Sequence, residues 1–125
     1  MRILNVVIRT EIETDFSDVF EINKAAFGKD NEAKLVDALR NSSVFIPDLS
    51  LVAAIDNKIV GHILFTKIKI IDDSGKEYDS IALAPMAVKP ELQKRGIGGQ
   101  LIKHGLYKAT ELGHKSVIVL GHEHY

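Results

Sequence analysis

The 125-residue chain has no cysteine, no long apolar run and no excess of charge of either sign. Without cysteine there is neither a disulfide framework nor a thiol nucleophile, so the composition favours a reducing, cytoplasmic location. No apolar stretch approaches the length of a membrane span. The N-terminal apolar segment is too short for a signal peptide and has no small-residue cleavage site, so it is predicted to be a first strand.

The charge balance also limits the partners. Sixteen basic and 17 acidic residues give a net charge of −1. A general nucleic-acid-binding protein needs a basic excess to neutralise phosphates, so neither nucleic acid nor a membrane surface is an expected partner. A local basic patch at Lys89, Lys94, Arg95 and Lys103 remains, and it would suit a phosphate-bearing ligand. The length predicts a single domain over residues 1–125.

The most informative stretch runs from Ala87 to Ile102 and contains Gly96, Gly98 and Gly99. An apolar run leads into it and an amphipathic run leaves it, which predicts a strand, a short basic loop and a helix. Glycines let a backbone approach a ligand without obstruction by Cβ atoms. The first turn of a helix offers unpaired N–H groups and the positive end of its dipole. These features together predict a site for a pyrophosphate-like anion.

Other phosphate motifs fit this stretch poorly. A Walker loop requires Gly-x-x-x-x-Gly-Lys-(Ser/Thr), and the chain has no such string. A dinucleotide fingerprint starting at Gly96 would need a third glycine where Leu101 stands, and an acidic residue where the chain reads Ser116-Val117-Ile118. The remaining alternative is a glycine-rich turn that only joins strand to helix, but two basic residues and three glycines are more than such a turn requires.

The segment Gln93–Gly98 resembles the (Gln/Arg)-x-x-Gly-x-(Gly/Ala) signature of the GNAT family of N-acetyltransferases, and Val88-Lys89-Pro90 resembles the Val-x-Pro that precedes it. The resemblance implies an α/β fold of α+β type, with a mixed, mostly antiparallel sheet flanked by helices in the order β-α-α-β-β-β-α-β. It implies acetyl-CoA as co-substrate. The family opens its central sheet at the fourth strand, where the pantetheine arm of CoA inserts like an extra strand.

The rest of the chain can be divided into elements of matching type. A helix is expected from Thr14, as N-cap, to Gly28, and a second short helix around 35–39. Residues 45–49 are expected to form a loop. The resemblance implies that Phe27, Phe45 and Ile46 line an acceptor pocket, and the alternative is that they belong to the core. The remaining expectations are strands at 3–10, 51–55, 59–70 and 81–88, a helix at 97–112 closed by Gly113, and a buried parallel strand at 116–120. Pro85 predicts a bulge or a broken pairing within its strand.

The resemblance assigns the cofactor site to the end of the fourth strand and to the following loop. The strand backbone would hold pantetheine, and the N–H of Val88 would serve the thioester oxyanion. The loop would hold the pyrophosphate. The cofactor-binding residues expected on this basis are Met86, Ala87, Val88, Gln93, Lys94, Arg95, Gly96, Ile97, Gly98 and Gly99.

The catalytic groups are less certain from sequence. Some family members carry a glutamate four residues before the Met86 position, where this chain has Ala82. Asp79 is the predicted base, with Glu77 and His62 as other candidates. The resemblance implies a tyrosine as general acid near the CoA sulfur, and Tyr125 is predicted for that role. The chain is expected to be a C-terminally short version of the domain, lacking the last two strands.

These observations predict direct acetyl transfer, in a ternary complex, to a primary amine on a small molecule or a peptide. Two alternatives remain: a CoA-binding module without turnover, and a small structural domain that never binds CoA. A homodimer could cover the apolar edge left by the strand at 116–120. No metal is expected, because His114, His122 and His124 have no cysteine or firm third ligand beside them.

Overall fold

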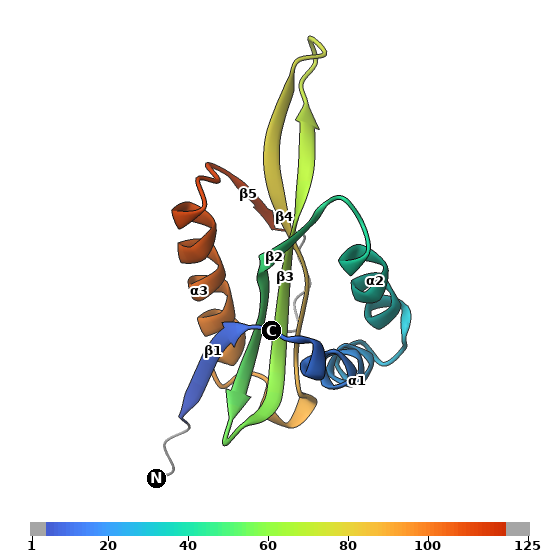
Figure 1. Cartoon of the computed structure of the whole chain (residues 1–125), viewed down its shortest axis with the longest axis vertical. Coiled ribbons are helices and arrows are strands. Elements are labelled where there is room, and N and C mark those ends of the chain that lie inside the picture. The colour runs from blue at the N-terminus through green and yellow to red at the C-terminus, as the bar shows by residue number, and fades with distance from the viewer. Residues whose placement is uncertain (1–4, 120–125) are drawn as a thin grey trace.

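The computed structural model describes residues 5–119 as a mixed α/β fold (Figure 1). The elements are β1 (Val6–Thr10), α1 (Phe16–Phe27), α2 (Asn31–Arg40), β2 (Phe45–Ile55), β3 (Lys58–Ile71), β4 (Glu77–Val88), α3 (Ile97–Glu111) and β5 (Val117–Val119). Short 3₁₀ turns lie before α1 (Glu13–Asp15) and after β4 (Pro90–Leu92). The order of helices and strands predicted from the sequence is confirmed.

The five strands form one sheet in the order β1-β2-β3-β4-β5. Neighbours are antiparallel from β1 to β4, whereas β5 runs parallel to β4. A parallel neighbour requires a crossover connection, and α3 provides it between β4 and β5. The sheet is therefore mixed and mostly antiparallel, as predicted.

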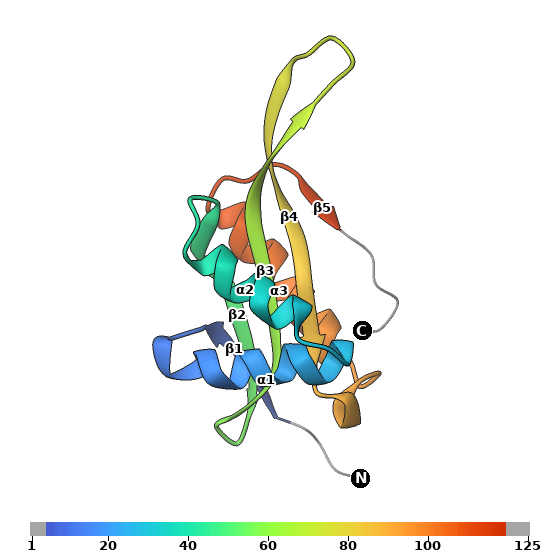
Figure 2. The same ribbon diagram turned by 90° about the vertical axis from the view of Figure 1, so that its right-hand side faces the viewer.

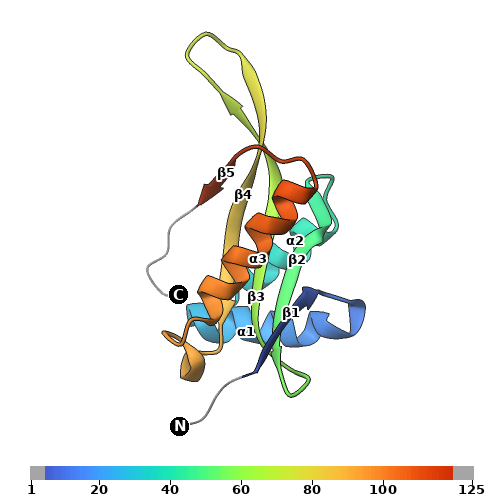
Figure 3. The ribbon, with the colours of Figure 1, turned by 90° about the vertical axis from the view of Figure 1, so that its left-hand side faces the viewer.

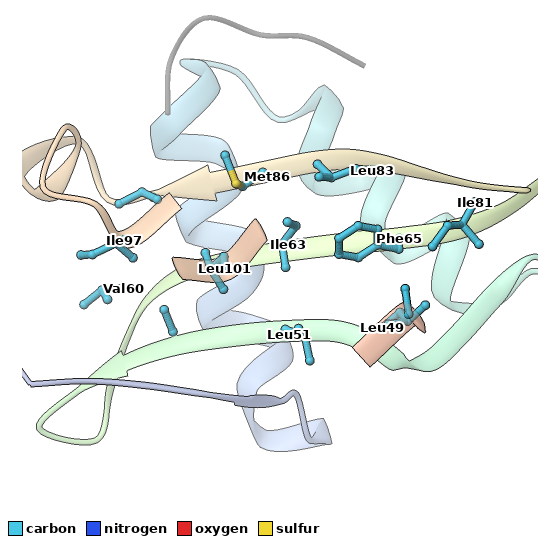
Figure 4. Packing of buried hydrophobic residues seen from close by; sticks show 13 residues of the cluster. Leu49, Leu51, Val60, Ile63, Phe65, Ile81, Leu83, Met86, Ile97 and Leu101 are labelled. Carbon is cyan, nitrogen blue, oxygen red and sulfur yellow. The ribbon is translucent and has the colours of Figure 1, made fainter. Parts of the chain in front are cut away.

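The helices cover both faces of the sheet. Helices α1 and α2 lie on one face (Figure 2), and α3 lies along the other (Figure 3). Successive side chains of β3 alternate between these layers: Ile63 and Phe65 pack in the cluster that contains Leu101 of α3, whereas Leu64 packs in the cluster that contains Val36 of α2. Figure 4 shows the first cluster, with Phe65 and Leu101 near its centre.

The structure corrects several local predictions. Residues 45–49, predicted as a loop, continue β2, although the pairing with β3 is irregular between Phe45 and Ser50. Thr14 lies inside a 3₁₀ turn and does not cap α1, whereas Gly28 ends that helix in the left-handed conformation with φ 74°, as predicted. Strand β5 is parallel as predicted but not buried, since Val119 is 52% exposed.

Strands β3 and β4 are longer than predicted and project past the helices as a two-stranded arm (Figures 1 and 2). The tip of the arm is held by Asp72, whose carboxylate accepts hydrogen bonds from the backbone and hydroxyl of Ser74 and from the backbone of Lys76. Within residues 5–119, no helix is long and apolar enough to cross a membrane.

Candidate functional site

The pairing of the central strands changes at Ala84 and Pro85, which are joined by a cis peptide bond. The register between β3 and β4 shifts here, so the bulge predicted at Pro85 is confirmed. On its other side, β4 pairs with β5 only from Ile81 to Leu83. Beyond this point, β4 continues to Val88 without a strand neighbour on the β5 side in the part of the chain that the structure describes.

The last residues of β4 direct backbone groups into this unpaired side. Lys89 donates its N–H to the carbonyl of Val60 on β3, at 2.9 Å. Adjacent residues of a strand point their backbone groups to opposite sides, so those of Val88, and of Met86 two residues earlier, point away from β3. Gln93 donates its side-chain amide to the Val88 carbonyl at 3.1 Å. The N–H of Val88 has no strand neighbour on its side within the described residues, so it is available to a ligand.

The loop after β4 presents a row of backbone amides. It turns through two left-handed residues, Lys94 (φ 64°) and Gly96 (φ 86°), before α3 begins at Ile97. Within residues 5–119, the backbone hydrogen bonds outside helices and strands include none donated by the amides of residues 94–99. The first of the helical amides with an intrahelical partner is that of Gln100, which donates to the Gly96 carbonyl at 3.1 Å. This loop is therefore a ready anion site.

The loop after β4 carries positively charged side chains. Lys94 and Arg95 are exposed. The ion pairs between described residues include none with Lys89, Lys94, Arg95 or Lys103. A hollow of about 340 Å³ lies between the loop and the β2–β3 turn, and its lining combines the cations Lys89 and Arg95 with the carboxylates Asp56 and Glu91. The structure thus brings the predicted cofactor residues together at one end of β4.

The structure does not bring Asp79 to the same place. Asp79 pairs with Lys69 on the arm and lines a separate hollow of about 740 Å³ with Ser80 and His114. It precedes Met86 by seven residues, which is roughly 20 Å of extended strand. Glu77, the neighbouring candidate, is bound to Lys69 at 3.3 Å nearer the tip.

The other predicted base, His62, is fully buried beneath α1. Its Nε2 lies 3.0 Å from the Ser50 hydroxyl, which in turn donates to the Glu11 carboxylate at 2.6 Å. Since the Ser50 proton is used on Glu11, His62 Nε2–H must donate to Ser50, and Nδ1 is left as an acceptor. Arg40 closes the network with two hydrogen bonds to Glu11 at 3.0 and 2.9 Å.

Burial lowers the pKa of His62 to about 4, outweighing the opposite effect of Glu11. A neutral imidazole with no exposed surface cannot meet an acceptor amine directly, so His62 is a structural residue. The sequence singled out His62 but not its partners, because Glu11 and Ser50 lie 39 residues apart. The one sequence signal was a histidine within the apolar strand pattern of β3.

The remaining candidates divide between the core and the chain ends. Phe27 and Phe45 are partly buried against the cluster under α1 and α2, and Ile46 packs against the cluster on the α3 side. These contacts agree with the core alternative. Tyr125, His122 and His124 lie outside the described residues, and no group of potential metal ligands occurs within 5–119.

Comparison with known proteins identifies one family. The model of the acetyltransferase (GNAT) family matches residues 16–124. "Uncharacterized N-acetyltransferase YjhQ" of Escherichia coli (strain K12) is 42% identical over 113 residues, which make up 90% of this chain and 62% of YjhQ. The chain therefore spans less than two thirds of that relative's length.

Two solved structures share the fold and contain the cofactor. A GNAT family acetyltransferase from Brucella melitensis, in complex with acetyl-CoA, is 33% identical with a TM-score of 0.83. The match covers 94% of this chain and 77% of that protein's chain. YhbS from Escherichia coli, in complex with CoA, is 30% identical with a TM-score of 0.84. The match covers 97% of this chain and 65% of the YhbS chain. By its matched residues and its arrangement of helices and strands, the chain belongs to the GNAT acetyltransferase family.

Proposed function

We propose that this chain binds acetyl-CoA along the end of β4 and transfers its acetyl group to a primary amine. The observation that carries the proposal is a pair of neighbouring groups of available backbone donors, one at Met86 and Val88 on the strand and the other at residues 94–99 in the loop. Pantetheine carries amides that can pair with a strand, and pyrophosphate is an anion that suits helical N–H groups. The CoA complexes of two relatives support the same ligand.

The proposed reaction is a direct attack. The amine nitrogen forms a bond with the thioester carbonyl carbon, and the C–S bond breaks to release the CoA thiolate. The attacking nitrogen loses a proton and the thiolate gains one. The N–H of Val88 would donate to the carbonyl oxygen as it becomes negative, which is the stabilisation that acyl transfer requires. No cysteine is available to carry an acetyl group between two half-reactions.

The proton donors and acceptors in this scheme are still predictions. Tyr125 as general acid remains a prediction, because it lies outside the described residues. The geometry gives no support to Asp79 as the base, since its side chain is exposed on the arm and far along the strand from Met86.

The proposal is tested by titrating acetyl-CoA into the protein by calorimetry. Gly98 lies in the first turn of α3, next to the loop amides, so Gly98→Trp puts a bulky side chain where the glycine has none. We expect binding in the wild type and at least a tenfold weaker Kd in this variant, because the tryptophan blocks the helical amides. Tyr107→Trp is the matched control, since Tyr107 lies on the same helix and is 72% exposed.

Urea unfolding of both variants shows whether each is folded. Wild-type protein that does not bind acetyl-CoA would contradict the proposal. Equal affinities for the wild type and folded Gly98→Trp would also contradict it, by placing the ligand elsewhere. Acetyl-CoA binding without acetylation of any primary amine would favour the second candidate, a CoA-binding module without turnover.

A further inference from the structure

The sheet ends at β1, whose outer side has no strand neighbour within residues 5–119. Figure 3, which looks onto the face covered by α3, shows β1 at one margin of the sheet and β5 at the other. Glu11 donates its N–H to the Ser50 carbonyl on β2 at 2.9 Å. Backbone groups of a strand alternate in direction, so every second residue back from Glu11 also faces β2, whereas Val6, Ile8 and Thr10 face outward. The outer side of β1 therefore offers a row of hydrogen-bond donors and acceptors.

Strand β1 lacks the main features that protect a sheet edge against pairing. Its sequence, Val-Val-Ile-Arg-Thr, contains no proline, and its pairing with β2 continues without a bulge. Valine, isoleucine and threonine also favour extended strands. Arg9 is the one charged residue of the strand, and its guanidinium is turned back onto Asp15 by two hydrogen bonds at 2.7 and 3.0 Å. This edge can therefore accept another strand.

Next to this edge, α3 presents a line of side chains at helical spacing, which we call the α3 stripe: His104, Tyr107, Lys108 and Glu111. The stripe lines the helix side of a hollow of about 200 Å³ between α3 and β1. Tyr107 is 72% exposed, and aromatic side chains are enriched in protein interfaces. The ion pairs between described residues include none with Lys108 or Glu111. The stripe thus combines an exposed ring with charges of both signs.

We infer that the outer side of β1 and the α3 stripe form the contact between two copies of this chain, related by a two-fold axis perpendicular to the sheet. Antiparallel pairing centred on Ile8 puts Ile8 opposite its equivalent and Val6 opposite Thr10, so each outward-facing residue has a partner. Arg9 donates to the Thr10 carbonyl at 3.2 Å, and a carbonyl oxygen has a second lone pair for another hydrogen bond. The two sheets then continue into one another.

The charges of the α3 stripe are the reason to choose a second copy as the partner. An axis perpendicular to the sheet keeps both α3 helices on the same face and makes them antiparallel. Each stripe then meets its own sequence in reverse order, as in any two-fold interface. Glu111 of one copy faces the His104 end of the other, and Lys108 faces Tyr107, where a cation–π contact is favourable. No like charges meet across the axis, whereas a partner with charge of a single sign would oppose either Lys108 or Glu111.

This contact is separate from the proposed cofactor site. The sheet order places β1 at the opposite margin from β4 and β5, so the pairing of two copies leaves the end of β4 open. The inference therefore does not depend on the proposed transferase function. It also differs from the homodimer predicted from the sequence, in which the strand at 116–120 was the covered edge.

Sedimentation equilibrium and amide hydrogen exchange of the wild type test the inference together. We expect a species of twice 13.8 kDa to form as the protein concentration rises. The outward-facing amides of Ile8 and Thr10 should become protected over the same range. The amides of Val7 and Arg9 are internal controls, because they face β2 and should be protected at every concentration. A mass of 13.8 kDa at millimolar concentration, or a dimer without added protection of Ile8 and Thr10, would overturn the inference.

A charge reversal tests the contribution of the α3 stripe. Glu111→Lys leaves each stripe with cations only, and a two-fold interface contains the substitution twice. We expect it to weaken the dimer about tenfold or more. Asp73→Lys is the matched control, because it makes the same change of charge at an exposed residue on the tip of the arm. Equal dimer dissociation constants for the two variants would overturn the inference.

Cross-linking separates the β1 edge from the β5 edge, and the absence of cysteine from the chain makes the experiment specific. Tyr107→Cys puts a thiol next to the proposed axis, so mild oxidation with diamide should link two copies. Ile118→Cys puts a thiol on β5, at a residue that is 39% exposed, and should link them much more slowly. Urea unfolding checks that both variants are folded. Cross-linking of Ile118→Cys at an equal or higher rate would overturn the inference.

Discussion

The buried imidazole of His62 makes the stability of the fold sensitive to acid between pH 6.5 and 4. Burial lowers the pKa of His62 from 6.5 to about 4. The unfolded chain therefore takes up a proton on this residue at a higher pH than the folded chain does. The contribution of His62 to stability is fully present above pH 6.5 and is lost progressively as the pH falls toward 4.

The magnitude follows from the shift. Each unit of pKa difference corresponds to about 1.4 kcal/mol, so the full effect of His62 is about 3 kcal/mol and the loss at pH 5 is about 2 kcal/mol. Acidification also affects Asp15, whose pKa is lowered mainly by its hydrogen bond from Arg9, because that carboxylate too binds a proton more readily in the unfolded chain. A variant that lacks the His62 imidazole but keeps Asp15 is therefore needed to separate the effect of His62 from that of Asp15.

The assay is urea unfolding, followed by circular dichroism, of the wild type and His62→Gln between pH 7.5 and 4.5. The variant will be less stable at pH 7.5, because it disturbs the hydrogen bond to Ser50. Its free energy of unfolding should nevertheless fall by about 2 kcal/mol less than that of the wild type between pH 7.5 and 5. Parallel curves for the two proteins would refute the argument, since they would mean that His62 titrates alike in the folded and unfolded chains.

Two further substitutions test the packing of the sheet. Gly105→Ala places a Cβ against the ring of buried Phe65, whose Cζ would lie 2.5 Å away, so it should lower the free energy of unfolding in urea by about 1–3 kcal/mol. Gly99→Ala, with open space around its Cβ, should be neutral or stabilising. Equal effects of the two substitutions would contradict the close packing of Gly105 on Phe65. Arg40→Met leaves the Glu11 carboxylate buried without its cation, so it should lower the free energy of unfolding by about 3–5 kcal/mol. Lys34→Met removes an exposed ion pair and should lower it by about 1 kcal/mol or less. Similar losses in the two variants would contradict the importance of the buried pair.

The parts of the fold that could be predicted from sequence are those with local physical causes. Helix α1 ends where Gly28 adopts a left-handed conformation, and α3 follows from apolar residues that recur at helical spacing. Pro85 cannot donate a ladder hydrogen bond, so a bulge could be expected at its position. Each of these causes acts within a few residues of the chain.

The misjudged parts depend on tertiary contacts. Pro47 and Asp48 have low strand propensity, yet the chain around them continues β2 because β3 lies beside it. Leu106 and Leu112 fit the apolar pattern of α3 but are 38% and 43% exposed, because only part of that helix faces the sheet. The exposure of the arm could not be anticipated either, since charged and apolar residues alternate in it as they would in a half-buried strand.

The same distinction explains why the cofactor half of the site can be read from sequence and the acceptor half cannot. Pyrophosphate is bound by backbone amides, and these are set by glycines and turn residues within one continuous stretch, from Met86 to Gly99. An acceptor amine must instead be bound by side chains that folding brings together from different elements. The sequence does not show such contacts between elements, so acceptor specificity in this chain has to be argued from packing.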